Sequence, residues 1–241
     1  DRRQRQMCIR DSLKSKKGVY SFTLDHWNEL WSIGASPVVR SVVYALIVAV
    51  VGTLFAALFA YYMDRRRVPG RTFFDCIATM PYMLPGTCFG IGYILAFNHA
   101  PLKLTGTAII VLANMLFKQL PTSAKICSAT LAQLQPAQER SAQDLGAGRL
   151  AVIRDVVLPN MRPALLSCFV YNFTSSMTTA GAIIFLIDPS RQLAVFRLFD
   201  AVYRGDYALA SVLASVITAI VLAVEGLVWL LSRKEGKRRV S

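Results

Sequence analysis

The sequence predicts an all-α membrane protein, a polytopic bundle with about five transmembrane helices. Hydrophobic residues make up 54% of the 241-residue chain and charged residues only 17%, and the mean hydropathy is +0.44. Soluble domains carry about 25% charged residues, so this composition excludes an ordinary soluble domain. Several apolar runs also approach or exceed the roughly 20 residues that a helix needs to cross about 30 Å of hydrocarbon.

The first twelve residues, DRRQRQMCIRDS, differ from the rest of the chain. They lack the apolar core of a signal peptide and resemble translated sequencing-adapter sequence found at the ends of assembled reading frames. We expect residues 1–12 to be a non-native leader and at least one span to precede the native five, which gives a six-span core. A genuine basic tail is the alternative interpretation.

Residues 13–37 are expected to form an external amphipathic segment. Within it, residues 20–36 place apolar and aromatic side chains close to helical spacing, including Trp27 and Trp31. Tryptophan is enriched at the boundary between membrane and water, which favours a helix along the outer surface. An ordinary amphipathic helix packed on the bundle is the other interpretation.

The membrane domain is expected over residues 38–232, with a basic tail at 233–241. The predicted spans cover residues 41–63, 76–97, 105–120, 163–187 and 208–231. The third span is the shortest and contains Asn114 and Lys118, although the lysine could extend its charged end toward water. Residues 121–162 then form a long loop, and residues 188–207 alternate apolar and charged side chains as an interfacial helix would.

Basic residues gather in the segments that flank these spans on one side. They are Arg65, Arg66, Arg67, Arg71, Lys118, Lys125, Arg140, Arg149, Arg154, Arg162, Arg233, Lys234, Lys237, Arg238 and Arg239. The positive-inside rule therefore places the loop 121–162 and the C-terminus in the cytoplasm of a bacterial inner membrane. The net charge of +13 is spread over these short segments and does not indicate nucleic-acid binding.

Two spans contain features that could line a pathway. Pro81 and Pro85 remove backbone donors from the second span, and such a break is tolerated where protein or a water-filled cavity satisfies the freed carbonyls. Tyr82 and Pro85 are the candidates there. The fourth span adds a polar run whose candidates are Asn172, Ser175, Ser176, Thr178 and Thr179. Bonding between helices is the simpler role for those side chains. Glu225 in the last span is also interpreted as structural.

The loop stretch RSAQDLGAGRLAVIRDVVLP, residues 140–159, is too long for a simple turn. Its spacing predicts a short helix, a break and a second short helix. It resembles the EAA loop of ABC-importer permeases, E-A-A-x3-G-x9-I-x-L-P, with which Ala142, Gly146, Leu158 and Pro159 agree and Val156 conservatively replaces isoleucine. Arg140 and Ser141 depart from that pattern, and Glu139 lies one residue before its usual acidic position.

The resemblance extends over most of residues 20–235 and is closest to iron(III)-type permeases, through MPYMLPG, the loop itself, and SSMTTAGAIIFLIDPS running into GDYALASVLA. It implies that the loop sits in a groove of an ATP-binding subunit. Gly146 would allow a tight break, Ala142 close approach and Leu158 an apolar anchor, while Pro159 would end the second helix. Arg140 puts the acidic contact in question, so either Glu139 replaces it or the partner carries a compensating charge.

The implied assembly contains ATP-binding subunits, a second permease half, an external solute-binding protein and membrane lipid. The sequence has no G-x-x-x-x-G-K-[ST] loop, no histidine pair at metal spacing and no G-x-S-x-G motif. We therefore expect no catalytic residue, metal or cofactor in this chain, with ATP and magnesium bound by the partner ATPase. Iron(III) is the expected solute, with thiamine, phosphonates, polyamines and sulfate-like anions as alternatives. A secondary transporter driven by an ion gradient and a scaffold protein are the competing classes.

Overall fold

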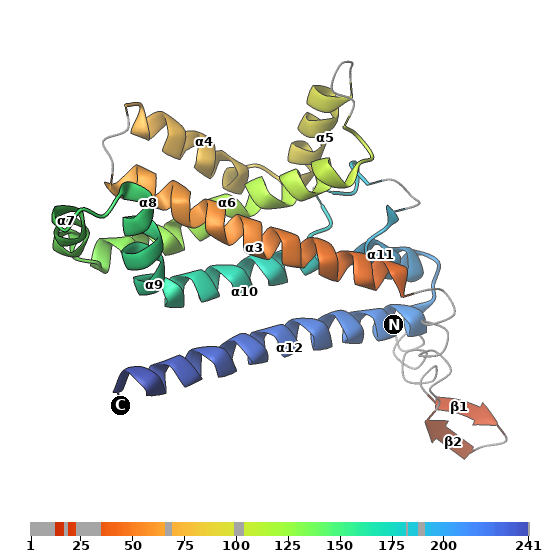
Figure 1. The fold of residues 1–241 in the computed structure, drawn as a ribbon. Coiled ribbons are helices and arrows are strands. Elements are labelled where there is room, and N and C mark those ends of the chain that lie inside the picture. The colour runs from red at the N-terminus through yellow and green to blue at the C-terminus, as the bar shows by residue number, and fades with distance from the viewer. Residues whose placement is uncertain are drawn as a thin grey trace.

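The computed structural model describes residues 13–16, 19–22, 35–65, 69–98, 104–181, 183–187 and 191–240, with side chains described between residues 35 and 233. The expected leader, residues 1–12, and residues 23–34 of the amphipathic segment lie outside the described residues. The elements are β1 Leu13–Lys16, β2 Val19–Phe22, α3 Ser36–Arg65, α4 Arg71–Met83, α5 Gly86–Phe97, α6 Ala108–Gln133, α7 Pro136–Asp144, α8 Arg149–Val152, the π-helix η1 Ile153–Val157, α9 Leu158–Asn160, α10 Arg162–Thr178, α11 Ala194–Tyr203 and α12 Tyr207–Val240 (Figure 1).

The two strands pair in an antiparallel hairpin, with Leu13 opposite Phe22. The helical spacing expected from residue 20 onward is therefore wrong for residues 20–22, which belong to a strand that Val19 and the aromatic Tyr20 and Phe22 favour. Apart from this hairpin, the regular elements of the described chain are helical, as the composition predicts.

The centre of the fold is a three-helix core in which α3 packs on both α6 and α10 (Figure 1). Helix α3 presents small residues at four-residue spacing, and Ala45, Ala49, Ala56 and Ala60 are all buried. Small side chains at this spacing lie on one face and let neighbouring backbones approach closely, which is how membrane helices associate. The sequence pattern of α3 therefore explains its central place.

Two of the five expected spans, α3 and α12, are long and apolar enough to cross a membrane, and the pair α4 and α5 could form a third. The second span is not continuous, because α4 and α5 meet at a bend of 116°. Pro81 lies inside α4 and Pro85 precedes α5, in agreement with the predicted break. Helix α10 ends at Thr178 after 17 residues and is too short to count as a span. Helix α6 is long enough, but its polar side chains make it too little apolar.

The loop expected at 121–162 begins later than predicted. Helix α6 continues through the buried Pro121 to Gln133, and only then do the short helices α7 to α9 begin. One proline removes a single backbone bond, and the packing of α6 against α3 and α4 offsets that loss. At the other end of the bundle, the expected interfacial helix is present but shorter, as α11.

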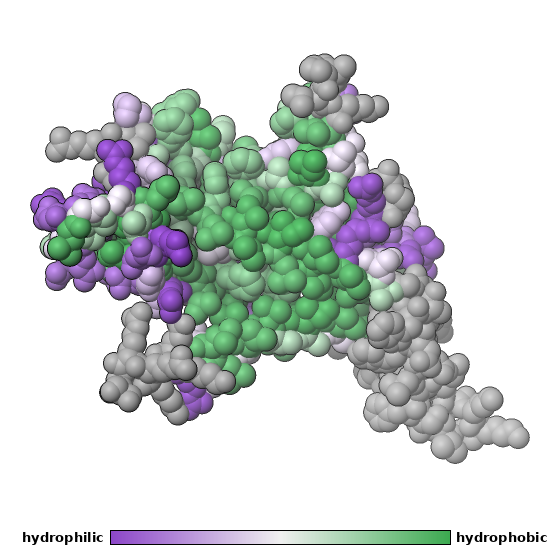
Figure 2. Space-filling model, viewed as in Figure 1, coloured by the Kyte–Doolittle hydropathy of each residue, from purple (hydrophilic) through white to green (hydrophobic). Residues whose placement is uncertain are grey.

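The surface has a broad hydrophobic belt between two hydrophilic ends (Figure 2). The end of α3 at Arg65, the short helices α7 to α9 and the C-terminal end of α12 lie together at one end, and α11 lies at the other (Figure 1). The backbone of α12 continues as a helix through the expected basic tail as far as Val240. A belt of this kind is what a chain surrounded by lipid presents.

Candidate functional site

The segment between α6 and α10 forms a short helix, a break and a second short helical stretch, as the sequence predicts. Helix α7 ends at Asp144, and α8, η1 and α9 follow one another without interruption from Arg149 to Asn160. Pro159 lies one residue before the end of this stretch, close to its predicted stopping point. The whole segment lies at one hydrophilic end of the bundle (Figures 1 and 2).

Gly146 makes the break, and its φ of +87° explains why glycine stands there. The amide of Gly146 donates to Gln143 O at 2.9 Å, and that of Ala147 donates to Ala142 O at 3.0 Å. These two bonds form a Schellman motif, which satisfies the last carbonyls of α7 and reverses the chain. Ala142 and Ala147 both pack against the core below, so Ala142 faces the protein's own interior.

Glu139 points into the molecule. Its Oε1 atom lies 3.1 Å from Arg65 Nε, and Tyr61 donates a hydrogen bond to its Oε2 atom at 3.2 Å. Arg140 and Ser141 are exposed instead. The Glu139 carboxylate is thus already paired within the chain, and this arrangement depends on α3, which is remote in sequence.

The outward-facing residues of this segment include two large apolar side chains that sequence reasoning did not select. Leu145 is 90% exposed and Leu150 is 79% exposed, on either side of the break at Gly146. Leucines close to a turn glycine are the sequence signal that could have identified these two residues, because no neighbouring helix covers a side chain at such a turn. Exposed leucines in a polar segment indicate a contact surface.

Val156 and Leu158 face the opposite way and pack, half-buried, against the core cluster. That cluster includes the buried residues Val152 and Val157 from the same stretch. Leu158, the expected apolar anchor, therefore packs in this structure against the chain's own core. Together these contacts fix the second helical stretch to the bundle, while its Leu150 remains outside.

The polar run of α10 divides into two faces. Asn172 is 1% exposed and Ser176 is buried beside it, both within the three-helix core. The oxygen Oδ1 of Asn172 accepts from Ser123 at 2.8 Å, and Nδ2 donates to Thr53 at 3.2 Å. Gln119 lies 2.9 Å from Ser176 Oγ and, with its amide nitrogen turned to Asn172, donates to Oδ1 at 3.1 Å. These groups bond α3, α6 and α10 together.

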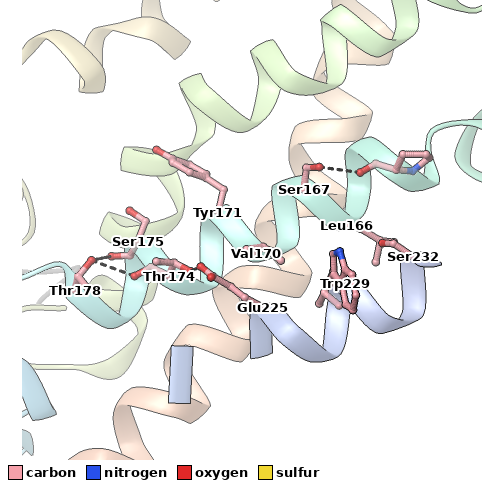
Figure 3. A pocket seen from close by; sticks show the side chains of 12 residues that line it. Leu166, Ser167, Val170, Tyr171, Thr174, Ser175, Thr178, Glu225, Trp229 and Ser232 are labelled. Atoms are coloured by element: carbon pink, nitrogen blue, oxygen red, sulfur yellow. Dashed lines mark hydrogen bonds between the residues drawn. The ribbon is translucent and has the colours of Figure 1, made fainter. Parts of the chain in front are cut away.

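The other face of the run borders a groove of about 870 Å³ between α10 and α12. Ser175 and Thr178 line it together with Tyr171 and Thr174, and Thr174 lies 3.4 Å from the Glu225 carboxylate of α12 (Figure 3). Thr178 bonds to carbonyls of its own helix. The groove offers hydroxyl groups and one carboxylate to whatever enters it.

The remaining expected pathway residues lie elsewhere. Tyr82 is strongly exposed near the end of α4, and Pro85 directly precedes α5 at the 116° bend. Thr179 is buried and donates to the carbonyl of Ser175. The structure therefore does not gather the expected residues into one site. Among the described residues, no group of three histidine, cysteine, aspartate or glutamate side chains could hold a metal ion.

Comparison with known proteins shows which protein family this sequence matches. The family model of the binding-protein-dependent transport system inner membrane component matches residues 49–236. The ferric transport system permease protein FbpB of Actinobacillus pleuropneumoniae is 32% identical over 210 residues, which cover 85% of this chain and 31% of that protein. The chain therefore spans about a third of the length of this relative.

The sulfate transport system permease protein CysT of Salmonella typhimurium is 31% identical over 232 residues, covering 89% of this chain and 84% of that protein. Among solved structures, a bacterial alginate ABC transporter in complex with a periplasmic protein bound to alginate pentasaccharide is similar, with a TM-score of 0.71. That match covers 95% of this chain and 86% of the other at 16% identity, so it shows a shared fold.

Proposed function

We propose, since this chain belongs to the family of binding-protein-dependent transport system inner membrane components, that it is a permease part of an ATP-driven solute importer. The family match, the two hydrophilic ends and the apolar belt between them support this proposal. The chain would cross the inner membrane several times, with the segment α7 to α9 and the C-terminus in the cytoplasm. The gathering of basic residues at that end favours this orientation.

The partners would be ATP-binding subunits that carry ATP and magnesium, a second permease half and an external solute-binding protein. The ferric relative is about three times as long as this chain, so the second half could be a separate chain or part of the same one. The similar alginate transporter, whose structure includes a periplasmic protein, supports a binding-protein partner.

The observation that carries the proposal is the division of the segment α7 to α9 into an anchored side and an open side. Val156, Leu158 and Glu139 hold the segment to the bundle, whereas Leu145 and Leu150 project from it. An ATP-binding subunit with an apolar groove would take the two leucines. Because the segment is fixed to the bundle, closure of the ATPase pair would move the helices attached to it.

The test uses two glycines of the same loop. Gly146 has a φ of +87°, whereas Gly148 has an ordinary φ of −65°, and an added Cβ would meet nothing within 4 Å at either position. Gly146→Val should thus distort the break, and Gly148→Val should not. We expect ATP-dependent uptake and ATPase co-purification to fall for Gly146→Val alone. Unchanged uptake in the Gly146→Val variant would refute the coupling role of this segment.

For the solute we propose iron(III), in keeping with the ferric relative at 85% coverage of this chain. The sulfate relative is equally similar and makes sulfate the competing solute. Uptake of radioactive iron and of radioactive sulfate by cells that produce the complete operon separates them. Uptake of sulfate alone would overturn the iron assignment, and uptake that persists without ATP but stops when ion gradients collapse would overturn the ATP-driven class.

Within the expected pathway set, Ser175 and Thr178 are the side chains that we propose for solute contact, because they border the groove beside Glu225. Asn172 and Ser176 already have partners on neighbouring helices. Ser175→Ala and Thr178→Val should therefore lower uptake without lowering the stability of the chain.

A further inference from the structure

Arg65, the last residue of α3, joins three elements at the hydrophilic end of the bundle. Its Nη2 atom donates to Leu131 O at 2.8 Å and to Leu134 O at 2.6 Å, at the end of α6. Its Nε atom lies 3.1 Å from Glu139 on α7. The last carbonyls of a helix have no partner within the helix, and a cation is favourable there. The guanidinium group therefore donates to carbonyls at the end of α6 and pairs with the carboxylate of α7 at the same time.

This pairing is sheltered from water. The side chains of Arg65 and Glu139 are 16% and 13% exposed, whereas the neighbouring pair Arg71 and Asp64 is 58% and 26% exposed. Tyr61, which is 2% exposed, adds its hydroxyl to the Glu139 carboxylate from one turn earlier in α3. Screening by salt is weak in such a place, so the pair retains much of its attraction.

Within the described part of the chain, helix α7 also contacts α8 and η1, but its side chains make few contacts with the bundle. None of its residues is buried, and its apolar contact with the core passes through the half-buried Ala142. Another side-chain link of α7 within the described part of the chain joins Asn160 to Gln138 at 3.4 Å, on the surface. The inward carboxylate is therefore the principal attachment of α7 to the bundle, and it ends on α3, the helix that packs on both α6 and α10.

We propose that Arg65 and Glu139 form a latch that transmits movement of α7 to α3, so that Glu139 is a positioning residue inside the permease rather than a contact for the ATPase. This inference rests on the proposed function for its consequence in transport. The contact between Arg65 and Glu139 does not depend on the proposed function. Both oxygens of the Glu139 carboxylate already have a partner within the chain, Arg65 for one and Tyr61 for the other.

The first experiment needs no partner. Hydrogen–deuterium exchange is measured on the purified full-length chain in detergent, for the wild type and for Glu139→Gln, Arg65→Lys and Asp64→Asn. Glu139→Gln keeps the shape of the side chain and removes its charge, and Asp64→Asn makes the same change in the exposed pair next to Arg65. We expect amides of α7 to exchange at least about fivefold faster in Glu139→Gln, with little change in Asp64→Asn. Arg65→Lys should be intermediate, since lysine keeps the charge without the fork.

The second experiment measures ATP hydrolysis and solute uptake by the complete complex in liposomes. The latch predicts that Glu139→Gln keeps ATPase binding and hydrolysis, while uptake per ATP falls by roughly 5-fold or more. A residue that only stabilised the fold would lower both rates together, and a residue that contacts the ATPase would lower co-purification. Equal α7 exchange in Glu139→Gln and Asp64→Asn would overturn the latch. A wild-type chain that binds no ATPase would overturn the proposed function and leave the exchange result standing.

Discussion

Asn172 gives the most direct test of the three-helix core, because one amide joins α3, α6 and α10. Replacing it with leucine keeps a similar shape and removes the bonds to Thr53, Ser123 and Gln119. Hydrogen bonds between membrane helices average about 0.6 kcal/mol each, so three of them amount to about 2 kcal/mol. The freed hydroxyls of Thr53 and Ser123 can bond back to carbonyls of their own helices. The loss of stability therefore stays below that expected for several buried polar groups without a hydrogen-bond partner.

The assay is reversible unfolding of the full chain in mixed micelles with increasing SDS, followed by circular dichroism. Thr178→Val is the matched control, because Thr178 lies on the same helix, is exposed and donates to carbonyls of its own turn. We expect Asn172→Leu to lose about 2 kcal/mol and Thr178→Val less than about 0.5 kcal/mol. Equal stability of the two variants would show that the buried amide does not hold the helices together.

Three further outcomes test other parts of the structure. Cys127 and Cys168, both buried with sulfur atoms 3.6 Å apart, should form an intramolecular disulfide with a membrane-permeant oxidant, seen as a loss of about 2 Da in the intact mass. Gly52→Leu should destabilise the chain by about 1–3 kcal/mol, because even a Cβ there would lie 3.3 Å from a buried amide nitrogen, whereas Gly52→Ala should be nearly neutral by the same unfolding assay. Leu145→Ser with Leu150→Ser should leave unfolding unchanged and abolish ATPase co-purification.

The sequence predicts those features of the fold that depend on residues close to one another in the chain. Gly146 marks the loop break because only a residue that tolerates positive φ suits a Schellman turn, and the structure has φ +87° there. Pro81 and Pro85 mark the break in the second span for a similar local reason. The angle of 116° between the two helices depends on packing against the rest of the bundle, and no local pattern gives it.

The features that sequence reasoning missed depend on residues far apart in the chain. Glu139 faces inward because Arg65, on another helix, lies beneath it. The polar run of α10 could have been divided by helical spacing, since Asn172 and Ser176 are four residues apart and share a face. Which face turns inward depends on partners on other helices, because the Asn172 amide bonds to Thr53 of α3 and Ser123 of α6.

The π-helix η1, Ile153–Val157, determines how the motif can vary in length. A π turn contains one more residue than an α turn, and one residue corresponds to about 100° of rotation around a helix axis. Leu150 lies before η1 and projects outward, while Leu158 follows it and packs on the core. The π turn absorbs this extra residue, so deleting one residue within η1 would restore a regular helix and leave Leu150 and Leu158 in nearly the same relative orientation. A relative that lacks one residue here would therefore present the same face to its partner, provided that the leucines are retained.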